Sequence, residues 1–206
     1  DLYSRRDLRY DENNAIYIDE NGNVATETIQ DVNKYVKLGS VLPDVNMSWR
    51  NDFRWRNFNF GFMISARLGG IVYSRTQAML DQYGVSEVTA AARDAGGVTL
   101  NGGDVVDAYT WYSAIAGGNS IPQFYTYSAT NVRLQEASIG YTIPRKLLRN
   151  VCEITVSIVG RNLWMLYNKA PFDPESIATT GNYYQGIDYF MMPSLRNVGF
   201  NLRFKF

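Results

Sequence analysis

The feature that most constrains the fold is an alternation of apolar and polar residues in five separate runs of the chain. In the last run, 195–206, every second residue from Val198 onward is apolar, and polar residues or glycine stand between them. Side chains of a β-strand point alternately to its two faces, so this pattern predicts a strand with one apolar and one polar face. It also predicts strands at 45–55, 58–68, 131–143 and 152–163, of which 131–143 alternates less cleanly.

The predicted strands have the length and the connections of a membrane β-barrel. Each is about ten residues long, which is what a tilted strand needs to cross a bilayer. The connections 56–57 and 144–151 are short, whereas 69–130 and 165–193 are long. Outer-membrane barrels have short periplasmic turns and long outer loops, so we expect the long segments, together with 1–44, to be extracellular loops.

Five strands are too few to close a barrel of this kind, and an open sheet would leave both edges unpaired. We therefore expect an all-β fold, the C-terminal strands of a larger transmembrane antiparallel β-barrel. Charged side chains on the polar faces are then expected to line a water-filled lumen, where they need no buried partner. These lumen-lining candidates are Arg50, Asp52, Arg54, Arg67, Glu153, Arg161, Arg203 and Lys205.

Composition argues against several classes of function. The 20 Lys and Arg residues balance 20 Asp and Glu residues, and no basic patch with interleaved aromatics occurs, so we expect no nucleic-acid partner. The chain has no His, which removes His-based triads and nearly every zinc site. Cys152 lies in an apolar run and is expected to be a buried or lipid-facing residue rather than a nucleophile.

No apolar stretch is long enough for a membrane helix, and the chain begins at Asp1 without a signal peptide. We therefore expect the 206 residues to be a piece of a longer protein.

Four motifs in order resemble a known family. The stretch "LGSVLPDVNMSWRNDFRWRNFNFGFMISARLGG" (38–70) is similar to a late-barrel segment of SusC/RagA-type TonB-dependent outer-membrane transporters. "VRLQEASIGYTIP" (132–144) resembles a strand of that family, and "GRNLWMLYNKAPFDPE" (160–175) resembles its stretch ending in Asp-Pro-Glu. "PSLRNVGFNLRFKF" (193–206) looks like its closing strand. The resemblance covers most of 35–206.

The resemblance implies the following expectations. The family has a barrel of 22 strands in the outer membrane of Gram-negative bacteria, an N-terminal plug and a segment that binds TonB. Its members work with a SusD-like lipoprotein and import glycans or peptides using the proton-motive force. The chain is thus expected to be no enzyme and, since plug and TonB-binding segment are absent from it, to need the rest of a transporter. The terminal Phe206 resembles the signal that the barrel-assembly machinery reads, although it could simply anchor the chain at the periplasmic interface.

Aromatic residues gather in the predicted loop around 107–128. Flat aromatic faces stack on sugar rings and pack against partner proteins, so this cluster is a candidate for contact with substrate or lid protein, although any one ring could instead belong to a loop core. Its members are Tyr109, Trp111, Tyr112, Phe124, Tyr125 and Tyr127. The segment 73–97 has helical composition and is expected to pack the loop down.

Two acidic motifs are weaker candidates. Asp19, Asn21 and Asn23 offer half of a calcium-loop pattern, but glycine and the twelfth-position ligand are misplaced, so a polar turn is the favoured interpretation and we expect no cofactor beyond a possible Ca²⁺ ion. Asp173 and Glu175 could form an acid–base pair, but a loop turn set by Pro174 is favoured.

Two other functions remain open. A soluble β-rich carbohydrate-binding module would explain the aromatic residues and would need no lipid. A passive porin would share the barrel but lack the plug and the lipoprotein partner.

Overall fold

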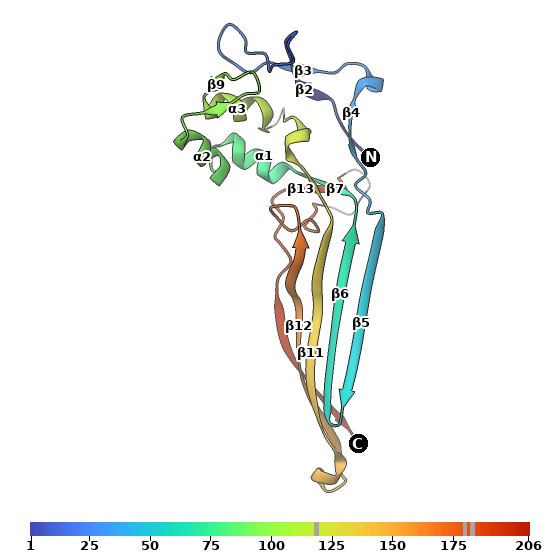
Figure 1. Cartoon of the computed structure of the whole chain (residues 1–206). Helices are drawn as coiled ribbons and strands as arrows, with labels where there is room; N and C mark the ends of the chain where they lie inside the picture. The colour runs from blue at the N-terminus through green and yellow to red at the C-terminus, as the bar shows by residue number, and fades with distance from the viewer. Residues whose placement is uncertain (118–119, 179–180, 182–183) are drawn as a thin grey trace. The chain divides into compact units, whose positions relative to one another are not determined.

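The computed structural model describes residues 1–117, 120–178, 181 and 184–206 and divides into two compact units. Unit 1 comprises 1–42, 71–127 and 177–191, and unit 2 comprises 43–70, 128–176 and 192–206. The segments expected to be strands belong to unit 2, and most of the segments expected to be loops belong to unit 1 (Figure 1).

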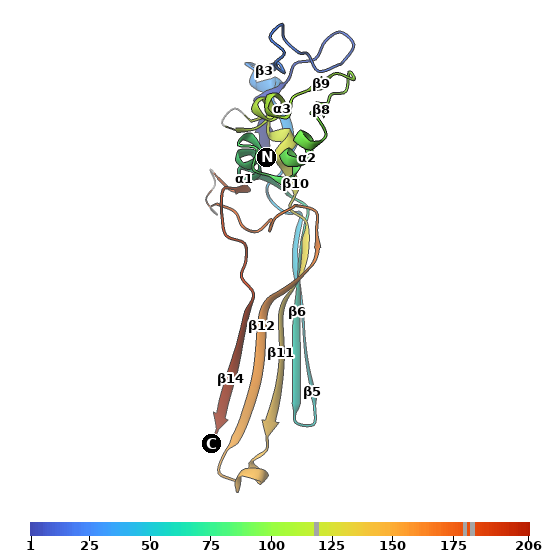
Figure 2. The ribbon, with the colours of Figure 1, turned by 90° about the vertical axis from the view of Figure 1, so that its left-hand side faces the viewer.

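Unit 2 is one antiparallel sheet of five strands in the order β14-β12-β11-β6-β5 (Figure 2). The strands are β5 (Val45–Trp55), β6 (Phe58–Leu68), β11 (Asn131–Ile143), β12 (Glu153–Asn168) and β14 (Asn197–Lys205). A short 3-10 helix, η4 (Arg145–Leu148), lies in the connection from β11 to β12. The described strands do not close into a barrel, and this open, predominantly β fold is the one that the alternation predicted.

The register places like residues on the same face of the sheet. Trp55 pairs with Phe58 across a two-residue turn, in which Arg56 has a φ of 53°. Asp52 pairs with Gly61 and Gly61 with Ser138, so the polar positions of neighbouring strands lie side by side. Ile154, Val156 and Ile158 of β12 pair with Phe204, Leu202 and Phe200 of β14 on the opposite, apolar face.

A β-bulge explains why the run 131–143 alternates less cleanly. Leu134 pairs with Ile64 and Glu136 with Met63, so Gln135 is an extra residue in β11. A bulge places two residues of one strand opposite one residue of its partner and shifts the alternation by one position. In a regular strand, residues three positions apart lie on opposite faces. Because of the bulge, Leu134 and Ala137 nevertheless share the apolar face.

Unit 1, which contains most of the segments expected to be loops, has its own hydrophobic core. Three helices, α1 (Arg75–Gln82), α2 (Glu87–Asp94) and α3 (Ala108–Ile115), begin at capping residues whose side chains accept backbone N–H groups. The core includes Leu8, Tyr73, Ala78, Tyr112, Ile115, Ile121 and Tyr125.

Short strands surround this core. Among the residues described in this unit, they form three two-stranded sheets and one three-stranded sheet of order β10-β7-β13. Their bounds are β1 (Leu2–Ser4), β2 (Arg6–Leu8), β3 (Thr26–Thr28), β4 (Val36–Gly39), β7 (Ile71–Ser74), β8 (Val98–Thr99), β9 (Val105–Val106), β10 (Thr126–Ser128) and β13 (Ile187–Asp188), with 3-10 helices η1 (Val32–Lys34) and η3 (Pro122–Tyr125).

Candidate functional site

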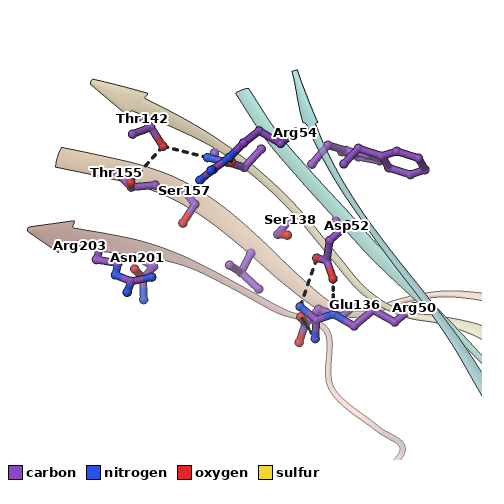
Figure 3. Close-up of a pocket in the computed structure, with 16 residues that line it drawn as sticks. Arg50, Asp52, Arg54, Glu136, Ser138, Thr142, Thr155, Ser157, Asn201 and Arg203 are labelled. Carbon is purple, nitrogen blue, oxygen red and sulfur yellow. Dashed lines mark hydrogen bonds and ion pairs between the residues drawn. The ribbon is translucent and has the colours of Figure 1, made fainter. Parts of the chain in front are cut away.

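The polar face of the sheet in unit 2 carries a hollow of about 530 Å³ (Figure 3). Every strand of the sheet supplies residues to its lining, because the register aligns their polar positions. Short polar side chains alternate in it with charged ones. The lining includes Arg50, Asp52, Arg54, Asn59, Glu136, Ser138, Thr142, Thr155, Ser157, Asn201 and Arg203.

A chain of ion pairs crosses the hollow. The Nε of Arg50 lies 2.9 Å from Oδ2 of Asp52, and its Nη1 lies 3.8 Å from Oε1 of Glu136. The other carboxylate oxygen of Glu136 lies 3.1 Å from Nε of Arg161. Glu136 thus bridges two arginines and connects strands β5, β11 and β12. Because the arginine side chains are more than half exposed, water screens these pairs and they contribute little to stability.

Sequence reasoning did not include Glu136 among the lumen-lining candidates. The signal that could have found it is its place opposite Ile139 and Tyr141 in the alternation of 131–143. The bulge at Gln135 obscured this alternation, since apolar residues on the two sides of it stand at positions of opposite parity.

Hydrogen bonds order the other end of the hollow. The Nε of Arg54 donates to Oδ1 of Asn59 at 3.0 Å, and the amide of Asn59 donates to Oγ1 of Thr142 at 2.9 Å. Thr142 and Thr155 lie 3.1 Å apart at their hydroxyls. Such a surface offers alternating donors and acceptors to hydroxyl or amide groups of a solute.

The remaining lumen-lining candidates also have polar-face positions. Glu153 and Lys205 are paired residues of β12 and β14. Arg161 lines a separate hollow with Asn197 and Asn201, and Arg67 lines another of about 370 Å³ that it shares with Glu175. That they line a closed lumen stays a prediction.

The opposite face of the sheet is apolar and aromatic. Trp55 and Phe58 lie 6.3 Å apart and Phe58 and Tyr141 lie 4.9 Å apart at their ring centroids. The Phe200 side chain is 82% exposed. Exposed apolar side chains along a whole sheet face indicate a surface made for apolar surroundings. The terminal Phe206 is exposed as well, and its role as an assembly signal stays a prediction.

The structure separates the six aromatic candidates of unit 1. Tyr112 and Tyr125 are buried in the core, and Trp111 packs against it with its ring centroid 5.7 Å from that of Phe124. Tyr127 is half-buried. Tyr109 on α3 is 75% exposed, which makes it the candidate with the most accessible ring for substrate or lid contact.

Asp19 forms a tight turn. Its Oδ1 accepts the backbone N–H groups of Asn21 and Asn23 at 2.9 and 2.7 Å, and these hydrogen bonds lower its pKa. Asp11 makes the same contacts with Asn13 and Ala15. Within the described residues no group of three or more Cys, Asp or Glu side chains is placed to hold a metal ion. Nor does any described helix have the length and apolar character to span a membrane.

Known proteins share both the sequence pattern and the fold. No protein-family model matches the chain. Over 176 residues it is 28% identical to TonB-dependent receptor P3 of Formosa agariphila, and this alignment covers 82% of the chain and 17% of that receptor. Over 208 aligned positions it is 26% identical to TonB-dependent receptor P26 of the same organism, with 93% and 19% covered. The chain therefore spans about a fifth of the length of these relatives.

Solved structures of the RagAB peptide importer have a similar fold. The "open-open" state matches with a TM-score of 0.65 and 14% identity over 99% of the chain and 22% of the importer chain. The "closed-closed" state matches with a TM-score of 0.63 at the same identity and coverage. Sequence similarity to TonB-dependent receptors and the fold shared with RagAB agree with the motif-based expectation, and the chain is thus similar to a segment of the SusC/RagA-type TonB-dependent transporters.

Proposed function

We propose that this chain is a section of the barrel wall of an outer-membrane importer for glycans or oligopeptides. The observation that carries the proposal is the two-faced sheet, whose apolar face suits lipid and whose charged face suits a wet lumen. The similarity to TonB-dependent receptors supports an import role in the outer membrane of a Gram-negative bacterium.

The mechanism follows from this division of faces. Lipid surrounds the apolar face, and the polar face guides solutes through alternating charges and hydroxyl groups. TonB, acting on a plug outside this chain, would open the lumen, and a SusD-like lipoprotein would deliver the substrate. The fold shared with the RagAB peptide importer supports oligopeptides as one class of substrate. The chain itself performs no reaction in this proposal.

Energy dependence of uptake tests this function. Cells lacking the gene would be given labelled oligopeptides and labelled oligosaccharides, with and without a protonophore. We expect wild-type cells to take up at least one class, and both gene deletion and the protonophore to abolish that uptake. Uptake that depends on the gene but not on the proton-motive force would favour a passive porin. Uptake that is independent of the gene would reject transport.

The soluble carbohydrate-binding module is the second candidate. It predicts that the protein fractionates with soluble proteins and binds sugars without detergent. The extended, exposed apolar face of unit 2 argues against it, since nothing among the described residues covers that face.

A further inference from the structure

The stretch that follows β12 lies across the polar face of the sheet. Arg133 pairs with Ser65 in the register, which places it on the same face as Arg67. Yet its side chain is only 5% exposed. The Nη2 of Arg133 lies 2.9 Å from Oδ1 of Asp173 and 3.3 Å from Oε2 of Glu175. A buried guanidinium thus holds this stretch against the sheet.

Asp173 joins three parts of the chain. Its Oδ1 also accepts the backbone N–H of Glu175 at 3.1 Å, and its Oδ2 accepts the backbone N–H of Ser194 at 3.2 Å. Burial raises the pKa of this carboxyl, but hydrogen bonds from Ser194, Glu175 and Arg133 outweigh burial, so the pKa lies below its usual value. The carboxylate is therefore charged at neutral pH and its hydrogen bonds persist.

The stretch is also internally ordered. The amide of Asn168 donates to the carbonyl oxygens of Ala170 and Phe172 at 2.9 and 2.7 Å. The side chain of Pro174 is fully buried, and the hydroxyl of Ser176 donates to the carbonyl of Met192 at 3.2 Å. Loops normally run over a surface with few such contacts, so this one is built to hold its shape.

Glu175 is the more exposed of the two carboxylates that contact Arg133. It is 40% exposed and lines a hollow of about 370 Å³ with Asn46, Ser48, Ser65 and Arg67. A carboxylate, a guanidinium and short polar side chains together favour solutes rich in hydroxyl or amide groups.

We propose that residues 168–176 form a fixed strap across the polar face, latched by Arg133 and Asp173, and that Glu175 and Arg67 beside it form a polar subsite contacted by passing solutes. The solute-contacting role rests on the proposed function, whereas the latch does not.

Amide hydrogen exchange in the native protein tests the latch. Asp173→Asn removes the closer of the two carboxylates that Arg133 contacts and weakens the acceptor of the Glu175 and Ser194 amides, so we expect exchange of the Glu175, Ser176 and Ser194 amides to become faster by about tenfold or more. Asp31→Asn is the matched control, because Asp31 accepts the N–H of Asn33 in an exposed turn of unit 1. Equal exchange in the Asp173→Asn protein and the wild type would overturn the latch.

Thiol labelling tests the subsite. In a Cys152→Ser background, Glu175→Cys would be modified with a bulky maleimide in cells, and uptake measured with the labelled peptides and oligosaccharides used above. We expect modification to reduce uptake at least tenfold, whereas modification of Lys34→Cys, on the exposed η1, leaves it unchanged. Undiminished uptake after complete labelling of Glu175→Cys would overturn the subsite. If unlabelled wild-type cells take up nothing, the subsite fails with the proposed function, and the exchange result still decides the latch.

Discussion

Ser74 performs two tasks at the start of α1. Its hydroxyl donates to Oδ2 of the buried Asp188 at 2.7 Å, and it accepts the backbone N–H of Gln77 at 3.1 Å. Ser74→Ala removes the helix cap and leaves a buried carboxylate short of a donor, so we expect a loss of about 2–4 kcal/mol in local stability. Amide exchange of α1 measures this loss.

Ser86→Ala is the control for the cap alone. Ser86 accepts the backbone N–H of Thr89 at the start of α2 at 3.2 Å, and its hydroxyl donates to the Thr89 hydroxyl at 3.2 Å rather than to a carboxylate. We expect a loss of about 1 kcal/mol in α2. Equal losses in the two variants would show that the contact with Asp188 contributes nothing.

Three phenols surround one carboxylate in unit 1. Burial, and then the charge of Asp81, raise the pKa of Tyr112, Tyr125 and Tyr127. An unfolded chain ionises its phenols at about pH 10, while the folded chain keeps these neutral, so the stability they contribute is complete below that pH and is lost as pH rises through their folded pKa.

Alkaline titration checks this sign. We expect tyrosinate absorbance to show a late-titrating group of phenols whose ionisation coincides with unfolding of unit 1. Asp81→Asn removes the negative charge and should shift that group to lower pH. Titration of all phenols together near pH 10 in the wild type would contradict the expectation.

At the scale of a strand, two glycines on the polar face differ in their surroundings. A Cβ added at Gly140 of β11 would lie 2.9 Å from Cβ of Ser157, whereas one added at Gly199 of β14 would meet nothing within 4 Å. We expect Gly140→Ala to force β11 and β12 apart at a cost of about 1–3 kcal/mol. Gly199→Ala should have little effect.

The temperature at which the folded, unboiled form disappears on a denaturing gel measures the difference between these variants. A drop for Gly140→Ala alone is the expected result. Equal melting of both variants would mean that the close approach of β11 and β12 at Gly140 relaxes without cost.

Strands were the elements most predictable from sequence, and for a physical reason. In β5 and β6, the alternation of Trp49, Phe53, Phe60 and Phe62 against polar neighbours reports directly which side of a strand meets which surroundings. The strand β12 continues to Asn168, whereas the sequence predicted its end at 163. The alternation of apolar and polar residues is interrupted near Asn162, which has a φ of 51°, and this interruption made the strand look shorter than it is. Local pattern does not reveal how a strand continues past such a break.

The latch at Arg133 could not be predicted for a different reason. The sequence predicted a turn at Asp173 and Glu175, and the hydrogen bond from the Glu175 N–H to the Asp173 carboxylate is indeed a local contact. Their ion pairs with Arg133 join residues forty positions apart, and only the register of β11 against β12 brings them together. The ion-pair chain through Glu136 is non-local in the same way.

For the whole molecule, the two units follow different rules. Unit 1 buries its apolar residues in a core, as a water-soluble domain does, whereas unit 2 exposes its apolar residues on one face and its charges on the other. Segments 1–44 and 69–130 were expected to be loops from their length between strands, and the length of a connection carries no information about its internal packing. Their core is made by residues as distant as Leu8 and Tyr125.

The face assignment of unit 2 makes a prediction from two adjacent residues. Phe200 and Asn201 are neighbours in β14, but Phe200 pairs with Ile158 on the apolar face and Asn201 with Ser157 on the polar face. Phe200→Arg would place a charge against lipid at a cost of up to about 2–4 kcal/mol near the bilayer midplane, whereas Asn201→Arg would place it in water. We therefore expect Phe200→Arg alone to reduce the amount of heat-modifiable protein in the outer membrane.

Strand propensity and local sequence are nearly the same for both variants, so the comparison isolates the surroundings of each face. The measurement is the ratio of folded to unfolded protein in membrane fractions, analysed boiled and unboiled. Equal assembly of the two variants would mean that the apolar face does not meet lipid, and a soluble fold with a covered sheet would then account better for unit 2. Reduced assembly of Asn201→Arg alone would reverse the assignment of the faces, with the charged hollow turned away from water.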